Sequence, residues 1–343
     1  MIQKLIYSLK RKCTEHYLRQ TYQCQYAFVG MGQHSLTNLY PVLRYLGVSL
    51  KYICVTTTYK AKLIERKYPL VKATVSLDEV LNDEEVKGVF VSALPSAHFS
   101  IASQVLKSGK SLFIEKPPCQ TLDELDVLIS LQRQYGSSVA MVGMQKRYAP
   151  AVRLLRKRLG REQLLNYDMH YLTGAYPEGD ALLDLYIHPV DLVCHLFGQP
   201  GILACRKVAK DSYILMLQHP HVAGTLELSA AYSWTGSEET LKICTRSGIY
   251  RLEQMEELMF EPKPSSIFGL PTDKMIRHHA LEEHLYQRNN AVPIPANNQI
   301  YSQGFFNEIE AFVSAIEHSH SDVLTSLPSL RMTYGTLLNI SDV

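Results

Sequence analysis

The side chains best suited to moving a proton lie in two short segments. Lys116 follows the apolar run 111–114, and Asp184 and His188 stand four residues apart. The ordinary pKa of histidine, about 6.5, lets an imidazole give or take a proton near neutral pH. From the residues alone, Lys116 could equally be a strand end turned to solvent, and the other two an exposed helix pair. Their apolar neighbours argue against a solvated helix, and Pro189 predicts a helix start or kink at His188.

A second chemical feature is a glycine-containing turn between an apolar run and a helical stretch. The turn consists of Gly30, Met31, Gly32, Gln33 and His34. The first glycine permits a tight turn, and the second lets the backbone approach a pyrophosphate at the helix N-terminus. Ser35 stands where a third glycine is usual. A lone Gly-x-Gly can be an ordinary turn, but its place after the first strand of an alternating series favours a bound dinucleotide.

The end of the second strand bears on the choice between NAD and NADP. An acidic residue there would bind the ribose 2′-hydroxyl. This chain has Thr56 and Thr57 instead, followed by Lys60. Nothing in that segment repels a 2′-phosphate, and the threonine hydroxyls with Lys60 could bind one. The sequence therefore favours NADP over NAD by a small margin.

The first half of the chain predicts a scaffold of alternating strands and helices. Apolar runs of strand length occur at 26–30, 50–55, 88–94, 111–114 and 138–143, and helical stretches at 36–46, 60–67, 97–108 and 121–135. Buried strands that alternate with helices form parallel sheets. The expected fold class is α/β, with a Rossmann-type doubly wound parallel sheet over residues 25–147.

The second half of the chain, residues 148–343, follows another pattern. An apolar helix at 180–197 precedes strand-like runs at 203–208, 212–218, 223–232, 239–245 and 248–253. No helix-length segment separates these runs, so we expect an α+β domain with a large, mostly antiparallel, open-faced sheet that serves substrate binding and oligomerisation. Residues 261–300 are expected to be irregular. A final helix at 303–318 has one apolar face, and the C-terminal helices can pack back on the first domain.

Composition limits the possible partners and compartments. The chain has 343 residues, 46% of them hydrophobic, and a net charge of +2, so no global field selects nucleic acid. No apolar run approaches the roughly 20 residues of a transmembrane span. Seven cysteines are scattered without a Cys-x-x-Cys pair, which predicts reduced thiols in the cytoplasm. Residues 1–24 predict a basic helical extension, either packed on the body or docking to a membrane surface or a partner protein.

Several motifs, in order, resemble the glucose–fructose oxidoreductase / inositol dehydrogenase (Gfo/Idh/MocA) family. They are Phe113-Ile-Glu-Lys-Pro-Pro118, Val91-Ser-Ala-Leu-Pro-Ser-Ala-His98, Val142-Gly-Met-Gln-Lys-Arg-Tyr-Ala-Pro150, Asp184-Leu-Tyr-Ile-His188-Pro-Val-Asp191 with Leu196-Phe-Gly198, and Ile316-Glu-His with Leu324-Thr-Ser326. The resemblance spans about residues 25–340. Gly179-Asp-Ala181 departs from the glycine run that commonly precedes the fourth motif, so substrate contacts there are expected to differ.

The resemblance implies an enzyme that moves a hydride between a nicotinamide and a secondary alcohol or ketone of a sugar, polyol or sugar-nucleotide. It implies that Lys116 contacts the hydroxyl, that His188 is the general base or acid, and that Asp184 orients its neighbours. The residues implied at the cofactor are Leu94, Pro95, His98 and Glu115. The family also implies a homodimer or homotetramer and a role in carbohydrate metabolism.

Alternatives remain at this point. Some members of the family cleave glycosidic bonds by transient oxidation with held NAD and elimination, and a cofactor-sensing regulator could use the same fold. Residues 1–24 could also dock to another oxidoreductase subunit. Asp191 and His195 with His188 have the spacing of a metal site, but hydride transfer needs no metal, so none is expected, and Asp191 should bond backbone. Lys146, Arg147 or Arg277 could form a basic subsite for a nucleotide.

Overall fold

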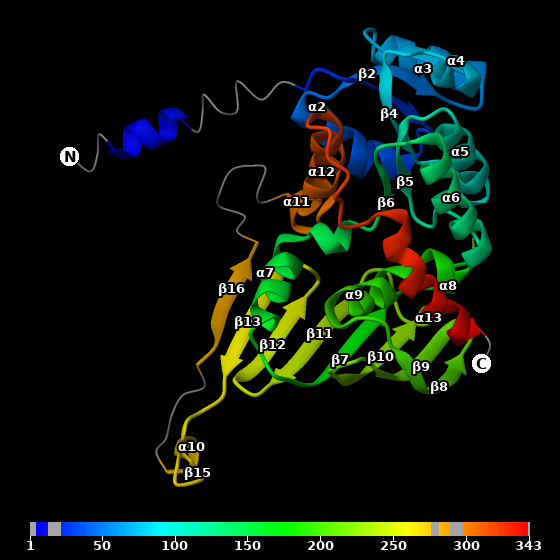
Figure 1. The fold of residues 1–343 in the computed structure, drawn as a ribbon. Coiled ribbons are helices and arrows are strands. Elements are labelled where there is room, and N and C mark those ends of the chain that lie inside the picture. The colour runs from blue at the N-terminus through cyan, green and yellow to red at the C-terminus, as the bar shows by residue number, and fades with distance from the viewer. Residues whose placement is uncertain (1–4, 13–21, 178, 276–280, 289–297, 342–343) are drawn as a thin grey trace.

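Two sheets dominate the computed structural model, the first in the upper part and the second in the lower part of the view (Figure 1). The structure describes residues 5–12, 22–177, 179–275, 281–288 and 298–341. The first sheet is formed by the first half of the chain and has helices on its faces. The second is broader and is formed by the second half, so the two predicted architectures follow each other along the chain.

The first sheet is six-stranded and parallel, in the order β3-β2-β1-β4-β5-β6. The strands are β1 (Gln25–Val29), β2 (Ser49–Cys54), β3 (Lys72–Thr74), β4 (Val86–Val91), β5 (Ser111–Glu115) and β6 (Ala140–Gly143). The connecting helices are η1 (Ser35–Leu39) with α2 (Tyr40–Leu46), α3 (Thr58–Lys67), α4 (Leu77–Leu81), α5 (Pro95–Lys107) and α6 (Leu122–Tyr135). The predicted doubly wound sheet is confirmed. Its carboxyl ends bring the turns after β1, β4 and β5 to one edge.

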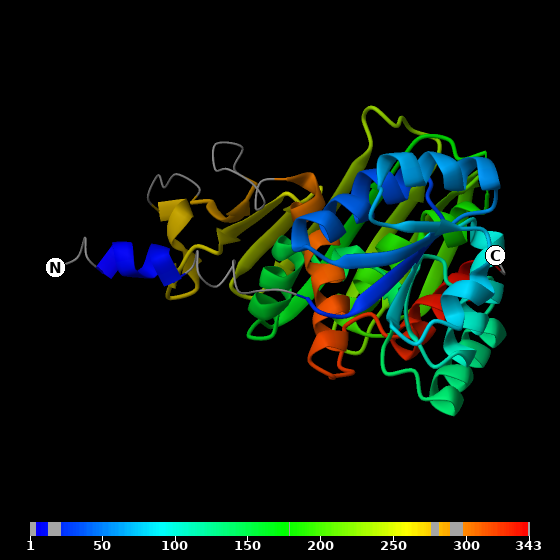
Figure 2. The same ribbon diagram turned by 90° about the horizontal axis from the view of Figure 1, so that it is seen from above.

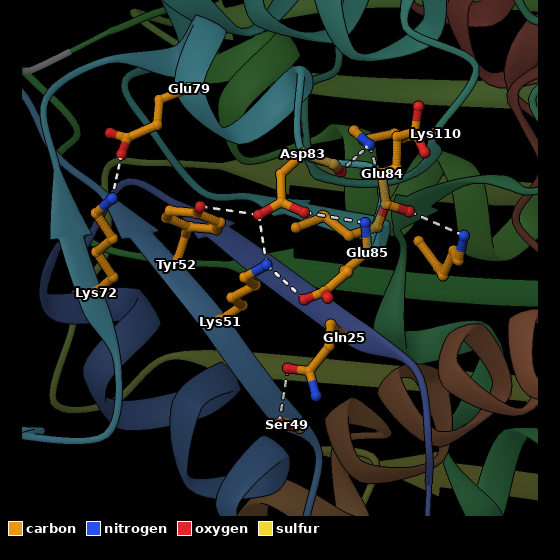
Figure 3. A network of polar contacts seen from close by, with 12 residues as sticks. Gln25, Ser49, Lys51, Tyr52, Lys72, Glu79, Asp83, Glu84, Glu85 and Lys110 are labelled. Atoms are coloured by element: carbon orange, nitrogen blue, oxygen red, sulfur yellow. Dashed lines mark hydrogen bonds and ion pairs between the residues drawn. The ribbon is translucent and has the colours of Figure 1, made fainter.

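A polar network fastens the opposite, amino-terminal edge of this sheet (Figure 3). Lys51 lies 2.6 Å from Asp83 and 2.5 Å from Glu85, and the Tyr52 hydroxyl donates to Asp83 at 2.8 Å. Lys110 donates to the main-chain oxygen of Asp83 at 2.7 Å. The charges of Lys51, Asp83 and Lys110 are thus satisfied by near neighbours, so this network holds the strands together and is not a candidate active site.

The second sheet has eight strands in the order β16-β13-β12-β11-β7-β10-β9-β8, and only its β7–β10 pair is parallel. The strands are β7 (Leu164–Leu172), β8 (Gly201–Ala209), β9 (Ser212–Gln218), β10 (Ala223–Ser229), β11 (Glu238–Thr245), β12 (Gly248–Glu253), β13 (Glu257–Pro262) and β16 (Glu283–Gln287). Burial alternates along β9 and β11, as expected for a sheet with one covered face. The mostly antiparallel sheet is confirmed, but β16 lies in the segment expected to be irregular.

Helices from the second half cover one face of the second sheet and also reach the first (Figures 1 and 2). They are α7 (Pro150–Leu159), α8 (Ala181–Asp184), α9 (Ile187–Phe197), α11 (Gln299–Ser302), α12 (Phe305–Glu317), η3 (Leu327–Leu330) and α13 (Arg331–Ser341). On α12, Phe312 packs against Phe90 and Phe113, with ring centroids 5.0 and 5.7 Å apart. The aromatic core of the first sheet is therefore completed by α12.

The N-terminal extension differs from its prediction. Residues 5–12 are helical and exposed, but residues 22–24 are not helical. The backbone N–H groups of Gln23 and Cys24 donate to the Glu317 carboxylate at 3.1 and 2.9 Å, which holds them as an extended lead into β1. One continuous helix over residues 1–24 was therefore wrong at its C-terminal end. Among the described residues, no helix has the length and apolar character to cross a membrane.

Candidate active site

The glycine-containing turn lies at the carboxyl end of β1, and its two glycines have different surroundings. Gly30 has φ +88°, and a Cβ atom there would lie 2.2 Å from the Ser92 main-chain oxygen, so only glycine fits. A Cβ at Gly32 would meet nothing within 4 Å. The backbone at Gly32 therefore faces open space at the start of a helix, which suits the close approach of a phosphate.

Ser35, which replaces the third glycine, is fully buried. Its hydroxyl donates to the Ser92 hydroxyl at 2.9 Å. This hydrogen bond joins the start of the helix to the end of β4. The close strand–helix contact that the third glycine normally permits is made here by two serines.

Thr56, Thr57 and Lys60 lie at the end of β2, where the sequence places the ribose. All three are exposed. The Thr57 side chain accepts a hydrogen bond from the Lys60 N–H at 3.2 Å and so begins α3. Lys60 and Met31 line one cavity of about 200 Å³. The structure thus brings the turn after β1 and the segment after β2 to a shared opening.

Glu115 connects this turn to the end of β5. It is 6% exposed, and its Oε2 atom accepts a hydrogen bond from the Lys116 N–H at 3.3 Å. The Nε2 atom of His34 lies 3.2 Å from Oε1 of Glu115. A Cβ at Gly143 would lie 3.0 Å from the Glu115 carboxyl group, so the glycine on β6 makes room for it. Glu115 therefore ties two loops together at the edge of the proposed cofactor site.

His98 is buried and contacts two loops through its ring nitrogens, so its side chain is not exposed to a ligand. It is 1% exposed, with Nδ1 2.7 Å from the Pro117 oxygen and Nε2 3.1 Å from the Ala93 oxygen. Burial lowers the pKa of His98, against the effect of these two carbonyls. The side chain thus positions the segment after Lys116. Leu94, just before α5, is 75% exposed, and Pro95 after it is partly exposed, so a ligand can reach this helix start.

Lys116 points into the protein, so the alternative of a solvated strand end is wrong. Its Nζ atom donates to the main-chain oxygen of Asp184 at 2.6 Å. Burial lowers the pKa of Lys116, whereas the charges of Glu115 and Asp184 raise it. This contact joins the carboxyl edge of the first sheet to the second half of the chain.

Asp184 is the last residue of α8, and α9 begins at Ile187. Asp184 and His188 therefore lie on two helices, so the single helix predicted at 180–197 is interrupted and the alternative of an exposed helix pair is wrong. The start of α9 just before His188 confirms the predicted effect of Pro189. Asp184 meets Lys116 through its backbone, not through its carboxylate.

The Asp184 carboxylate has its own surroundings. It is 9% exposed and accepts a hydrogen bond from the Tyr176 hydroxyl at 3.4 Å. A Cβ at Gly179 would lie 2.1 Å from its Oδ2 atom, so a larger residue there would displace the carboxylate. Burial raises the pKa of Asp184, and the nearby charge of Lys116 lowers it. A carboxylate held in this way can orient a neighbouring hydroxyl.

His188 lies in the first turn of α9. Its Nδ1 atom is buried and has no hydrogen-bond partner among the described residues. Burial holds the pKa of His188 well below its usual range, and the positive charges of Lys116, Lys146 and His34 lower it further. The ring is therefore neutral at pH 7.

Two buried ion pairs near these residues were not predicted from the sequence. Lys146 forms a buried ion pair with Glu239 and lies 4.8 Å from the centre of the Tyr171 ring. Arg147 is bound by both oxygens of Asp191, at 2.8 and 2.5 Å. Neither cation is free to form the basic subsite, and Asp191 bonds a side chain where a backbone contact was expected. Arg277 lies outside the described residues.

The surroundings of Asp191 do not favour the possible metal site of His188, Asp191 and His195. Asp191 accepts a further hydrogen bond from Thr333 at 2.8 Å, and with Arg147 this occupies its carboxylate. Within the described part of the chain, no three His, Cys, Asp or Glu side chains are grouped to hold a metal ion.

Comparison with known proteins relates the first sheet and its helices to an oxidoreductase family. Residues 24–144 match the family model described as "Oxidoreductase family, NAD-binding Rossmann fold". The chain is 28% identical over 191 residues to the putative oxidoreductase YceM of Salmonella typhimurium, covering 52% of this chain and 62% of that one. It is 24% identical over 161 residues to inositol 2-dehydrogenase of the same species, covering 45% and 48%. The matches span about half of the length of these relatives.

Solved structures match over nearly the whole chain. A dehydrogenase from Chromobacterium violaceum has a TM-score of 0.78 at 20% identity and covers 94% of this chain and 95% of that one. Levoglucosan dehydrogenase, in complex with NADH and levoglucosan, has a TM-score of 0.77 at 17% identity, covering 93% and 96%. UDP-N-acetylglucosamine 3-dehydrogenase from Acidithiobacillus ferrooxidans has a TM-score of 0.72 at 20% identity, covering 92% and 96%. The predicted two-sheet fold is thus confirmed.

Proposed function

We propose that this chain, whose residues 24–144 form the NAD-binding Rossmann fold of the Gfo/Idh/MocA oxidoreductases, transfers a hydride between a nicotinamide and a secondary alcohol or ketone of a carbohydrate. The observation that supports the proposal is the hydrogen bond from Lys116 to the Asp184 carbonyl, which joins the carboxyl edge of the first sheet, where the turn at Gly30–Gly32 also lies, to the segment that carries His188. The dehydrogenases of similar fold act on inositol, levoglucosan and a nucleotide sugar.

The residues present fit a dinucleotide. The turn opens at Gly32, and the segment after β2 shares a cavity with Met31. When bound, the nicotinamide supplies the acceptor or donor of the hydride. We propose NADP ahead of NAD, because Thr56, Thr57 and Lys60 are exposed at the end of β2 and no carboxylate stands there.

The chain's own residues would handle the proton. When an alcohol loses hydride from carbon, its O–H bond must also break, and the proton needs an acceptor. The Lys116 ammonium, fixed by the Asp184 carbonyl, would donate a hydrogen bond to the alcohol oxygen and stabilise its developing negative charge. The neutral imidazole of His188 would take the proton. In the reverse direction, the same groups return it to the ketone oxygen.

The test begins with cofactor binding. NAD, NADH, NADP and NADPH would be titrated by fluorescence, and turnover would be followed with uncharged polyols and sugars, including myo-inositol and levoglucosan, and with UDP-N-acetylglucosamine. We expect saturable binding with NADP(H) preferred. Net formation of NAD(P)H separates this reaction from elimination-type glycoside cleavage, in which no reduced cofactor accumulates. No binding of any of the four would refute the proposal.

Two variants test the site itself. Lys116→Met and His188→Asn should each lower kcat by about 10²–10⁴-fold, the range for lost acid–base catalysis, with cofactor Kd nearly unchanged. Lys107→Met, at an exposed position on α5, is the matched control. Wild-type turnover in Lys116→Met would contradict the assigned chemistry.

We also propose that the open face of the second sheet pairs with another copy of the chain. Its outer strands expose apolar side chains at Leu203, Val208, Ile214 and Met216. Apolar patches of this kind commonly mark protein–protein contacts. Light scattering of the purified protein should give a dimer or tetramer mass, and Ile214→Asp should lower that mass; a monomer in the wild type would contradict the proposal.

A further inference from the structure

We infer that Trp234 forms a stacking subsite for an uncharged ring of the carbohydrate substrate, beside the reaction centre. This inference rests on the proposed function and specifies its substrate. Trp234 is the single tryptophan of the chain and lies between β10 and β11. Its side chain is 55% exposed, so a large aromatic surface faces solvent near the site.

The indole of Trp234 is held by Gly174 and Ala175, which together form its seat. Its Nε1 atom donates to the Ala175 main-chain oxygen at 2.9 Å. A Cβ at Gly174 would lie 2.3 Å from the indole Cδ1 atom, so the ring packs directly on the backbone there. The glycine and the hydrogen bond fix the ring in one orientation while leaving part of it open. A rigid exposed aromatic surface binds a ring with little loss of its own conformational entropy.

The seat is linked to the reaction centre by adjacent residues. Tyr176 follows Ala175 in the chain, and its hydroxyl donates to the Asp184 carboxylate. The Asp184 carbonyl in turn binds Lys116. The length of a tyrosine side chain therefore separates the backbone under the indole from Asp184. On this path, Trp234 would hold a part of the substrate that lies beyond the reacting carbon.

Charge around the seat favours an uncharged ligand. The segments 173–186 and 230–239 contain no Lys, Arg or His in the sequence. They carry carboxylates at Asp180, Asp184 and Glu238, and the buried cations beside them are already bound, Lys146 by Glu239 and Lys116 by the Asp184 carbonyl. Carboxylates accept hydrogen bonds from hydroxyl groups and repel phosphates. The C–H face of a sugar ring on the indole, with its hydroxyls toward these carboxylates, satisfies both features.

The first experiment measures KM and kcat with saturating cofactor on the uncharged sugar or polyol that the wild type turns over best. Trp234→Leu should raise KM about tenfold, equivalent to about 1.4 kcal/mol of lost binding, with kcat within about threefold. Gly174→Ala should raise KM similarly, because it displaces the indole without removing it. Trp234→Phe should lie between them and the wild type. Tyr232→Leu is the matched control, an exposed aromatic of the same loop, and should leave KM unchanged.

The second experiment uses the fluorescence of the single tryptophan. In the free protein, acrylamide should quench Trp234 readily, and the same sugar should protect it. An unchanged KM in Trp234→Leu, an equal rise in Tyr232→Leu, or protection by UDP-N-acetylglucosamine alone would overturn the inference. An increase in quenching when the free protein is diluted would also overturn the inference, because it would place the indole in a subunit contact.

These outcomes remain distinct from failure of the proposed function. If no sugar or polyol is turned over and no nicotinamide cofactor binds, the proposed function fails and this inference fails with it. If turnover depends on Lys116 but not on Trp234, only the stacking subsite is refuted.

Discussion

Replacing Arg147 by methionine should lower the free energy of unfolding by about 3–5 kcal/mol, the usual cost of removing one partner from a buried ion pair. Arg147 and Asp191 are 3% and 2% exposed, and the pair is bidentate. The guanidinium also donates to the Leu324 oxygen at 2.8 Å and the Ser329 hydroxyl at 3.0 Å. Arg147 thereby connects the segment after β6, α9 and the chain before η3.

The magnitude follows from what the substitution leaves behind. Without Arg147, the one hydrogen bond to the Asp191 carboxylate that remains among the described residues is that from Thr333. A buried charge with so few partners is costly, and typical domains are stable by only about 5–15 kcal/mol. Removing both charges in Arg147→Met/Asp191→Leu should recover most of the loss, because the unpaired charge is then absent.

Urea unfolding, followed by far-ultraviolet circular dichroism and by the Trp234 emission, measures these differences. Coincident transitions would support the two-state analysis. Arg153→Met, at an exposed position on α7, is the matched control and should change stability by less than about 0.5 kcal/mol. A loss below about 1 kcal/mol in Arg147→Met, or a double variant as unstable as the sum of the single ones, would refute the reasoning.

Three further predictions concern the cofactor and pH. Thr56→Asp should shift the ratio of the Kd values for NADPH and NADH about tenfold toward NADH, since a carboxylate there binds the 2′-hydroxyl and repels a 2′-phosphate; an unchanged ratio would place the ribose elsewhere. Burial raises the pKa of Glu308 well above its usual range, so its stabilising contribution is complete at acid pH and is lost as pH rises through the folded pKa. The Tm of Glu308→Gln relative to that of the wild type should therefore rise as the pH increases from 5 to 8, and a Tm difference that stays constant over this range would contradict this. Burial lowers the pKa of His195 to about 4, so stability should fall as pH drops from about 6.5 to that value, and His195→Asn should lose less at pH 4.5 in urea titrations; equal losses would assign the acid sensitivity to other groups.

The first sheet could be predicted from sequence because its signals are local. Its long helices have caps, such as Thr121, whose side chain accepts from the Glu124 N–H, and Gly136, with φ +69°. The short β3 and α4 were missed, since three to five residues carry too little periodicity. β16 was missed because its pairing with β13 joins residues distant in the chain.

Candidate residues of the site could be named from the sequence, but most of their contacts could not. Lys116 and Asp184 were both named from the sequence, and the structure joins them through the Asp184 carbonyl, whereas the role of His188 stays a prediction. The spacing of Asp184 and His188 was misread as one helix because the break at 185–186 has no glycine or proline of its own. The ion pair of Lys146 with Glu239 was missed, since partners 93 positions apart leave no local pattern.

The position of α12 has a consequence for how the chain is made. Phe312 completes an aromatic cluster with Phe90, yet 222 positions separate them in the chain. At a synthesis rate of about 5–20 residues per second, the ribosome needs roughly 11–44 seconds to pass from one to the other. During that interval the nascent first sheet exposes Phe90 and Phe113 without their partner, and the start of β1 lacks Glu317. A chain arrested before residue 305 should therefore bind chaperones or aggregate instead of releasing a stable N-terminal half.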